Sequence, residues 1–280
     1  MSILSITVKR GLFTLKNQSI VEIKQMLDQG ILSDEAIEQL KLDSRKGVQQ
    51  AVQSYQNKQA KQALLIKQFQ AMRKYEEKNY LKGKQFIAGI DEVGRGPLAG
   101  PVVAAAVILP ENFTLIGLTD SKKLTVKQRE AYAEIIKQQA VAIGIGEISP
   151  QLIDELNIYQ ASILAMERAV DQLTVQPDHL LIDAVELSNL AYSSDVIIKG
   201  DQKSISIAAA SVIAKVYRDQ IMAELHRTYP YYQFDQNQGY GTKGHLQGLE
   251  EHGITPFHRK SFAPVKDKLK GGGGDGTTLI

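Results

Sequence analysis

The chain has 280 residues, 43% hydrophobic and 23% charged, which is enough apolar sequence to bury a sizeable core. It has no cysteine, which excludes disulfides and thiolate metal sites, so any metal must be held by carboxylates or histidines. That ligand set favours hard ions such as Mg²⁺ or Mn²⁺. No apolar run approaches the ~20 residues of a spanning helix, and the N-terminus lacks a signal-like block. We therefore expect a cytoplasmic protein with no membrane partner.

Residues 1–84 differ in composition from the rest, being rich in glutamine, lysine and glutamate with apolar residues at helical spacing. Between Lys41 and Lys84, eleven Lys and Arg stand against three Asp and Glu, a local charge of +8. Two interpretations stay open: a solvated pair of helices, or a basic helical extension that contacts a polyanion. The sequence predicts a basic helical N-terminal extension over 1–84, linked onward at Lys82-Gly83-Lys84.

Three strands and one helix are predicted between residues 85 and 148. The strands are 86–91, the proline-bracketed run 101–110, and 140–146. The second is apolar on both faces, as in a strand covered on both sides. Thr125 and Gln128 have the spacing of a capping box, which predicts a helix that begins near Val126.

The remaining sequence predicts four more segments of clear type, two helices and two strands. Ser149-Pro150 is a helix start, and one apolar face continues to Leu173. Short strands are expected at 179–183 and 195–201, each with an acid at its end. A long helix is predicted from Ser204 to about Tyr229. Residues 238–245 read as a polar loop, and 267–280, with four glycines in a row, as a flexible tail.

Acidic residues therefore end three predicted strands, and one of these positions is doubled. They are Asp91, Glu92, Asp183 and Asp201. Ligands gather at strand ends in open α/β sheets, so the four carboxylates are expected to form one cluster. Four carboxylates cannot all stay ionised at close range without cations. Two divalent metal ions are the usual solution in nucleases and polymerases.

A glycine-rich stretch follows the first acids and superficially resembles a dinucleotide-binding fingerprint. In Gly94-Arg95-Gly96-Pro97-Leu98-Ala99-Gly100 the third glycine comes one position late, and a strand-like run follows where a helix should begin. The glycines are better explained by close approach of the backbone and Arg95 to a ligand.

The run Asp91-Glu92-Val-Gly94-Arg95-Gly96-Pro-Leu-Ala-Gly-Pro resembles the signature of type 2 ribonucleases H, specifically the bacterial ribonuclease HII family. The resemblance covers roughly residues 85–266, with its blocks in family order. The further blocks are Asp120-Ser-Lys-Lys-Leu, Leu181-Ile-Asp183, Lys199-Gly200-Asp201, Ser206 to Val216, Gly239-Tyr240-Gly-Thr and His258 to Val265.

This resemblance implies an α/β fold with a ribonuclease H-like mixed sheet flanked by helices, and a catalytic domain over 85–266 that ends in C-terminal helices. It implies an endonuclease that hydrolyses the RNA strand of RNA–DNA hybrids and cuts 5′ of ribonucleotides embedded in duplex DNA. Asp91, Glu92, Asp183 and Asp201 would be the catalytic metal ligands, for two Mn²⁺ or Mg²⁺ ions when substrate is bound. The expected products carry 5′-phosphate and 3′-hydroxyl ends, and the enzyme is expected to be a monomer.

The same resemblance implies that Gly94, Arg95 and Gly96 recognise the ribose 2′-hydroxyl, with Tyr240 against the sugar. The 2′-hydroxyl is what separates RNA from DNA at a given position. Lys122 and Lys123 are candidates for phosphate contacts, although each lysine is equally explained as solvated surface. Capping is favoured for Ser121 and Ser204, and a structural role for His258.

Two other classes of protein remain as alternatives. A catalytically silent nucleic-acid-binding module of the same fold would have no need for four mutually repelling carboxylates. A DEDD-type exonuclease also gathers four acids, but the Asp91-Glu92 pair and the glycine–arginine loop fit that family poorly. A metal-dependent ribonuclease is therefore the favoured hypothesis.

Overall fold

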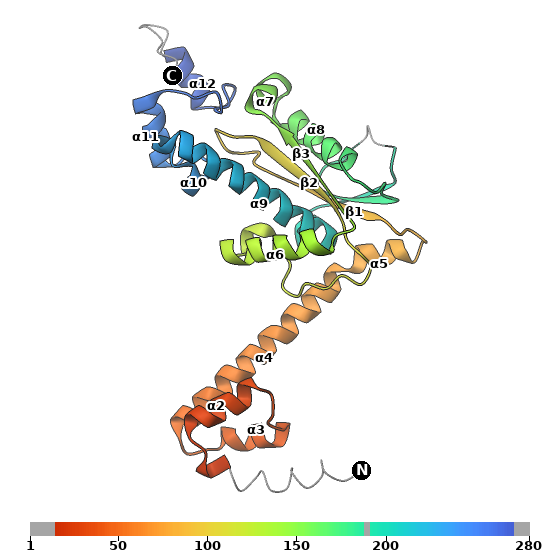
Figure 1. The fold of residues 1–280 in the computed structure, drawn as a ribbon, viewed down its shortest axis with the longest axis vertical. Helices are drawn as coiled ribbons and strands as arrows, with labels where there is room; N and C mark the ends of the chain where they lie inside the picture. Colours follow the sequence, from red (N-terminus) through yellow and green to blue (C-terminus); the bar gives the residue numbers. More distant parts are fainter. Residues whose placement is uncertain (1–14, 188–190, 272–280) are drawn as a thin grey trace. The chain divides into compact units, whose positions relative to one another are not determined.

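The computed structural model describes residues 15–187 and 191–271 (Figure 1). Contacts along the chain divide it into two compact units, Met1–Gln68 and Phe69–Ile280. The last helix, α12 (Val265–Gly271), takes in the first residues of the predicted tail, and 272–280 lie outside the described residues. No helix in the described ranges combines the length and apolar character needed to cross a membrane.

The first unit is helical, as predicted. It consists of η1 (Leu15–Asn17), α2 (Ile20–Asp28), α3 (Asp34–Lys41) and most of α4 (Lys46–Met72). Ser19 and Glu22 form a capping box that begins α2, and the Ser33 side chain caps α3. The apolar faces of these helices bury Ile23, Leu27, Leu40 and Val48 in a small core of their own.

The second unit is built on a five-stranded sheet in the order β3-β2-β1-β4-β5. Its strands are β1 (Ile87–Val93), β2 (Val102–Ile108), β3 (Ala142–Ile148), β4 (His179–Asp183) and β5 (Ser194–Ile197). The β1–β2 and β2–β3 pairs are antiparallel, while β1–β4 and β4–β5 are parallel. The predicted mixed sheet is confirmed, with β1 at its centre.

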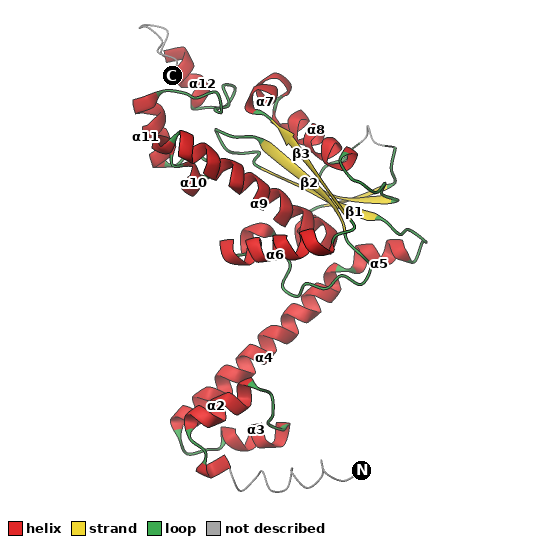
Figure 2. Cartoon of the chain, in the orientation of Figure 1, coloured by secondary structure: helices red, strands yellow, loops and turns green. Residues whose placement is uncertain are grey.

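Helices cover both faces of this sheet (Figure 2). The remaining helices are α5 (Lys74–Tyr80), α6 (Val126–Gln139), α7 (Pro150–Leu156), α8 (Ile158–Asp171), α9 (Ile205–Thr228), α10 (Phe234–Asn237) and α11 (Lys243–His252), with short 3-10 turns η2 (Ser121–Lys123), η3 (Gly200–Gln202) and η4 (Pro230–Tyr232). The capping box of Thr125 and Gln128 begins α6, and the Ser204 side chain caps α9, both as predicted.

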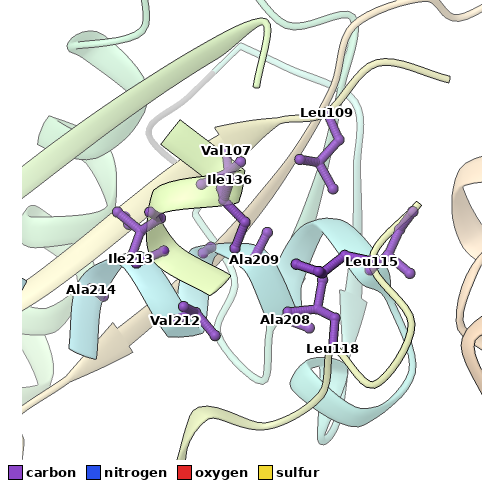
Figure 3. Close-up of a cluster of buried hydrophobic side chains, with 14 of the residues drawn as sticks. Val107, Leu109, Leu115, Leu118, Ile136, Ala208, Ala209, Val212, Ile213 and Ala214 are labelled. Atoms are coloured by element: carbon purple, nitrogen blue, oxygen red, sulfur yellow. The ribbon is translucent and has the colours of Figure 1, made fainter. Parts of the chain in front are cut away.

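Two apolar cores fill the spaces between the sheet and its helices. On one face, Val107 of β2 packs with Ile136 of α6 and Ile213 of α9 (Figure 3). On the other face, α8 packs against β1–β3 through residues such as Met166 and Ala169. β2 is buried along its whole length because both of its faces are covered, which explains its continuous apolar run.

The close approach of α9 to the central strand depends on Gly89. A Cβ atom at this position would lie 2.0 Å from the carbonyl carbon of Ser206 in the first turn of α9. Only glycine allows the helix to cross β1 at this distance. This crossing brings the beginning of α9 beside the end of β1 that carries Asp91 and Glu92.

In three further places the bounds or types of elements differ from the sequence-based expectation. The single helix expected after Ser149 is two helices, α7 and α8, because Asn157 has φ 73° and its side chain caps the second. The strand expected over 195–201 ends at Ile197, so Asp201 lies in η3. The expected polar loop 238–245 gives way at Lys243 to α11, whose His245 is fully buried.

Candidate active site

The sheet register brings Asp91 and Asp183 together. β1 and β4 pair in parallel through Ile90 and Ile182, so the two aspartates each follow directly after the last paired residues. Asp91 is 7% exposed, and against the effect of burial the nearby Ser211 hydroxyl of α9 acts to lower its pKa. Asp183, on the neighbouring strand, is half-buried. Adjacent parallel strands thus supply two carboxylates to one point.

Asp201 reaches this point from a turn rather than a strand. Lys199 adopts the left-handed conformation with φ 57°, which reverses the chain after β5. The next residue, Gly200, donates its backbone N–H to Asp183 Oδ1 at 2.7 Å. That bond fixes the turn against β4 and places the buried Asp201 near Asp183, whose charge helps to raise the pKa of Asp201.

Two cations lie next to the carboxylates. The Arg95 guanidinium is 3.6 Å from Glu92 Oε1, with 42% of the arginine side chain exposed. The Lys122 charge, in η2, acts on both Glu92 and Asp201. Lys123 follows Lys122 and is also exposed. The cluster of four carboxylates is therefore only partly balanced by the charge of the protein itself.

The carboxylates hold their protons more tightly than isolated acids. Burial and then the charge of Glu92 raise the pKa of Asp91 well above its usual value. Burial also raises the pKa of Glu92, against the lowering effect of Arg95. For Asp201, burial followed by the charges of Asp120 and Asp183 raises the pKa to about 6. Such mutual shifts indicate a shared site that favours an added positive charge.

The donor set of this site fits a hard divalent cation. All four side chains offer carboxylate oxygens, the ligands that Mg²⁺ and Mn²⁺ prefer. Within 15–187 and 191–271, no three His, Asp or Glu side chains are arranged closely enough to hold an ion as they stand. Burial and the charges of neighbouring acids raise the pKa values of Asp91, Glu92 and Asp201, as expected for carboxylates that would bind a metal ion.

The glycine–arginine loop lies directly after β1. Gly94 has φ +91°, and a Cβ there would lie 2.2 Å from Arg218 Nε, so the position requires glycine for its conformation and for space. Gly96 is exposed and faces the ring of Tyr240, whose Cε1 would be 3.3 Å from a Cβ at that position. The side chain of Tyr240 is 49% exposed. The structure thus places the loop and Tyr240 side by side at the surface.

Three polar residues near the site, Asp120, Ser121 and Ser211, have contacts that the sequence does not indicate. Asp120 is 8% exposed and its charge acts on Asp201. Ser121, expected to cap a helix, instead has its hydroxyl 2.9 Å from that of Ser211, whose hydroxyl acts to lower the pKa of Asp91. These contacts join η2 to α9 and β1, segments far apart along the chain, so only the tertiary fold reveals them.

Glu76 is a buried acid within the segment assigned to the extension. It is 1% exposed, and its Oε1 accepts hydrogen bonds from the Ser204 hydroxyl at 2.5 Å and the Ser206 N–H at 3.0 Å. Its Oε2 is buried and makes no hydrogen bond to any described residue. Glu76 of α5 thus holds the N-terminus of α9 within the second unit. Burial outweighs these hydrogen bonds and raises its pKa.

This shift makes a prediction about pH and stability. The pKa of Glu76 in the folded protein is above the usual 4.5, so the unfolded chain releases this proton first as pH rises. Ionisation of Glu76 therefore lowers the free energy of unfolding between the two pKa values, and the loss persists at higher pH. Urea titrations of wild type and Glu76→Gln should diverge in favour of the variant as pH rises from about 4 to 7. A pH-independent difference would contradict this.

The five-stranded mixed sheet covered by helices places the second unit in the ribonuclease H-like class of nucleases. Residues 88–265 match the family model described as Ribonuclease HII, and residues 19–80 match that of the Ribonuclease HII N-terminal domain. The chain belongs to the ribonuclease HII family. It is a ribonuclease H, an endonuclease that acts on the RNA of RNA–DNA hybrids.

Whole-chain relatives agree with this assignment. Ribonuclease HII of Oceanobacillus iheyensis is 54% identical over 251 residues, 90% of this chain and 96% of the relative. Ribonuclease HII of Enterococcus faecalis is 50% identical over 91% of this chain and 100% of its own. Among solved structures, ribonuclease H2 of Pyrococcus horikoshii OT3 gives a TM-score of 0.58 at 26% identity, covering 66% of this chain and 97% of that one.

A more distant structure shares the fold alone. Bst-RNase HIII, solved in complex with Mn²⁺, has a TM-score of 0.55 at 19% identity and covers 66% of this chain and 70% of its own.

Proposed function

We propose that the enzyme cuts 5′ of ribonucleotides embedded in duplex DNA, in addition to the RNA strand of hybrids, and leaves 5′-phosphate and 3′-hydroxyl ends. The observation that carries the proposal is the shared site of Asp91, Glu92, Asp183 and Asp201, whose mutual repulsion and burial raise three of their pKa values. Such a site is costly to bury unless cations balance it.

The proposed ligands of two Mn²⁺ or Mg²⁺ ions are these four carboxylates. When bound, the ions would activate a water molecule and neutralise charge on the leaving oxygen. Groups of the protein itself support this arrangement: the Gly200 backbone N–H orients Asp183, the Ser211 hydroxyl acts to lower the pKa of Asp91, and Arg95 pairs with Glu92. Lys122 adds positive charge at the rim, where it would hold a substrate phosphate.

Recognition of the sugar is proposed for the loop Gly94-Arg95-Gly96 together with Tyr240. Gly96 has no side chain between the backbone and the Tyr240 ring, so a ribose can approach both. Backbone groups of the loop would bind the 2′-hydroxyl, while the ring packs against the adjacent sugar. DNA lacks this hydroxyl, so the backbone groups that would bind it are left unpaired when deoxyribose is present. That difference is a strong basis for discrimination between ribose and deoxyribose.

The decisive experiment uses duplex DNA that carries one ribonucleotide, an all-DNA duplex of the same sequence, and a long hybrid. With Mg²⁺ or Mn²⁺ we expect cleavage on the 5′ side of the ribonucleotide, no cleavage of the all-DNA duplex, and none of any substrate in EDTA. Mass spectrometry of the fragments reads the end groups. Cleavage of the hybrid alone would contradict the proposal, and binding without any cleavage would support the silent module instead.

We further propose that the basic helical extension contacts the duplex backbone. Lys61 and Lys67 are exposed on α4. If both contact phosphates, Lys61→Gln with Lys67→Gln should reduce the slope of log Kd against log salt by about 1 to 2. The control is Lys127→Gln with Lys137→Gln, which removes the same charge from exposed positions on α6. Equal slopes for the two pairs would leave α4 as an ordinary solvated helix.

A further inference from the structure

The consecutive residues His258 and Arg259 are both buried, at 1% and 0% exposure. They lie against the end of the glycine–arginine loop: His258 forms an isolated bridge with Ala99, and the Arg259 N–H donates to Leu98 O at 2.8 Å. The pair belongs to a sequence block to which the proposed function gives no role. Its side chains point in two directions, toward the two parts of the proposed sugar site.

Arg259 holds the glycine–arginine loop from the inside. Its guanidinium donates to Gly94 O at 2.6 Å, to Arg95 O at 2.9 Å, and through two nitrogens to Gly100 O at 3.0 and 2.9 Å. The guanidinium carbon also lies 5.1 Å from the centre of the Phe262 ring. Burial lowers the Arg259 pKa to about 9, so the group stays cationic at neutral pH. A planar donor of this kind fixes several carbonyls at once.

His258 reaches Tyr240 through a second histidine, and the hydrogen bonds define the direction of the chain. Thr255 N–H can only donate, so His258 Nδ1 accepts its bond at 2.9 Å and the neutral ring carries its proton on Nε2. His258 Nε2 then donates to His245 Nε2 at 3.0 Å. The His245 proton must therefore be on Nδ1, which donates to Tyr240 O at 3.0 Å.

A second buried guanidinium ties the same two segments together. Arg218 of α9 is 1% exposed and donates to Pro101 O, Ala99 O and Gln238 O at 3.0, 3.2 and 3.0 Å. Its contacts therefore join the segment just before β2, at Ala99 and Pro101, to Gln238, which lies just before Tyr240. The loop and the residues around Tyr240 are thus held by buried donors: the two guanidinium groups bond backbone carbonyls, and His258 bonds His245, which in turn donates to Tyr240 O.

We propose that His258 and Arg259 are positioning residues for ribose recognition: Arg259 sets the backbone of Gly94-Arg95-Gly96, and His258 sets Tyr240 through His245. This rests on the proposed role of the loop and Tyr240 in sensing the 2′-hydroxyl. Buried hydrogen bonds of this kind restrict a site to one geometry, and discrimination falls when that geometry loosens.

The test measures how well the protein distinguishes ribose from deoxyribose. The measured quantity is the dissociation constant for an all-DNA duplex divided by that for the same duplex with one ribonucleotide, so a lower ratio means weaker discrimination. All variants carry Asp183→Asn so that the substrate survives in Mg²⁺. In His245→Gln the amide takes the place of the histidine Nε2, so the donor to Tyr240 O is lost. In His245→Asn the amide takes the place of Nδ1, so that donor is kept. We expect His245→Gln to lower the ratio about 5- to 10-fold, and His245→Asn to restore most of it.

Arg259→Lys is expected to lower the ratio by a similar factor, because a single ammonium nitrogen cannot reproduce the planar fork in which separate guanidinium nitrogens reach the carbonyls of Gly94, Arg95 and Gly100. In a Tyr240→Ala background, His245→Gln should have no further effect, since it acts through Tyr240, while Arg259→Lys should still lower the ratio. Met166→Ala, in the core on the other face of the sheet, controls for general destabilisation and should leave the ratio unchanged. Where Arg259→Lys does not fold, Arg259→Gln takes its place.

Distinct results overturn the two ideas. An unchanged ratio in folded His245→Gln and Arg259→Lys proteins, with Tyr240→Ala lowering it, would refute the positioning role and keep the proposed function. An unchanged ratio in Tyr240→Ala itself would refute the sugar contact. Equal effects of His245→Gln and His245→Asn would show that the histidine acts only as buried bulk, which also overturns the inference.

Discussion

Asp183→Asn is expected to lower the turnover number on the order of 10³-fold while leaving the fold intact. The substitution removes a charge from the proposed metal site, and lost stabilisation of several kcal/mol corresponds to a factor of this size. The fold is expected to survive because the asparagine side-chain oxygen can still accept the Gly200 N–H bond that Asp183 Oδ1 receives. Single-turnover kinetics on a hybrid, together with circular dichroism and thermal melting, measure both effects.

Asp178→Asn is the matched control, since it makes the same chemical change directly before β4, whereas Asp183 is the last residue of that strand. Asp178 accepts the backbone N–H groups of Gln85 and Phe86 at 2.8 and 2.9 Å, and it is exposed just before β4. Turnover within about twofold of wild type is expected for this variant. If Asp183→Asn retained a tenth or more of the wild-type rate, the four-carboxylate metal site would have to be abandoned.

Gly94→Ala is expected to damage both stability and turnover. The left-handed backbone at φ +91° is unfavourable for alanine, and the new Cβ would lie 2.2 Å from the buried Arg218 Nε. The guanidinium cannot move without breaking its bonds to Pro101 O, Ala99 O and Gln238 O. The loop must therefore shift, and a displacement of about 1 Å is sufficient to cost on the order of 10²-fold in rate.

Gly83→Ala separates backbone strain from crowding. Gly83 has φ +81°, close to that of Gly94, but nothing lies within 4 Å of the position a Cβ would take. Urea denaturation should show Gly94→Ala to be less stable than Gly83→Ala by about 1 to 3 kcal/mol, the usual cost of overpacking. Equal losses would mean that the structure beside Gly94 accommodates a methyl group, and that the loop needs glycine only for its conformation.

Local features of this fold follow directly from neighbouring residues. The β2 run between prolines, the Thr125–Gln128 capping box and the Ser204 cap each depend on a few adjacent residues, and each was predicted where the structure has it. The break between α7 and α8 was not predicted, because the positive-φ conformation of Asn157 depends on how α8 packs rather than on neighbouring residues. Apolar periodicity continues across that break and so suggests one helix.

The acidic residues of the candidate site could also be recognised from short stretches of sequence. Asp91, Glu92 and Asp183 could be placed at strand ends by pattern alone, whereas the 3-10 turn that carries Asp201 was expected to be a strand. Its placement depends on a left-handed Lys199 and on the Gly200 bond to Asp183, a contact between residues on different segments. Carboxylates that repel one another can only be held together by such packing.

By itself, the sequence determined most of the strands, the Thr125 and Ser204 caps and the set of acidic candidate ligands, since these depend on local hydrogen bonds and side-chain alternation. Only the tertiary structure decided that Glu76 holds α9, and that His245 and His258 meet although no metal-ligand spacing links them. It alone directed Arg259 to the carbonyls of Gly94 and Arg95. Buried polar groups need hydrogen-bond partners, and packing supplies those partners from residues far away in the sequence. No local sequence pattern indicates which residues these are.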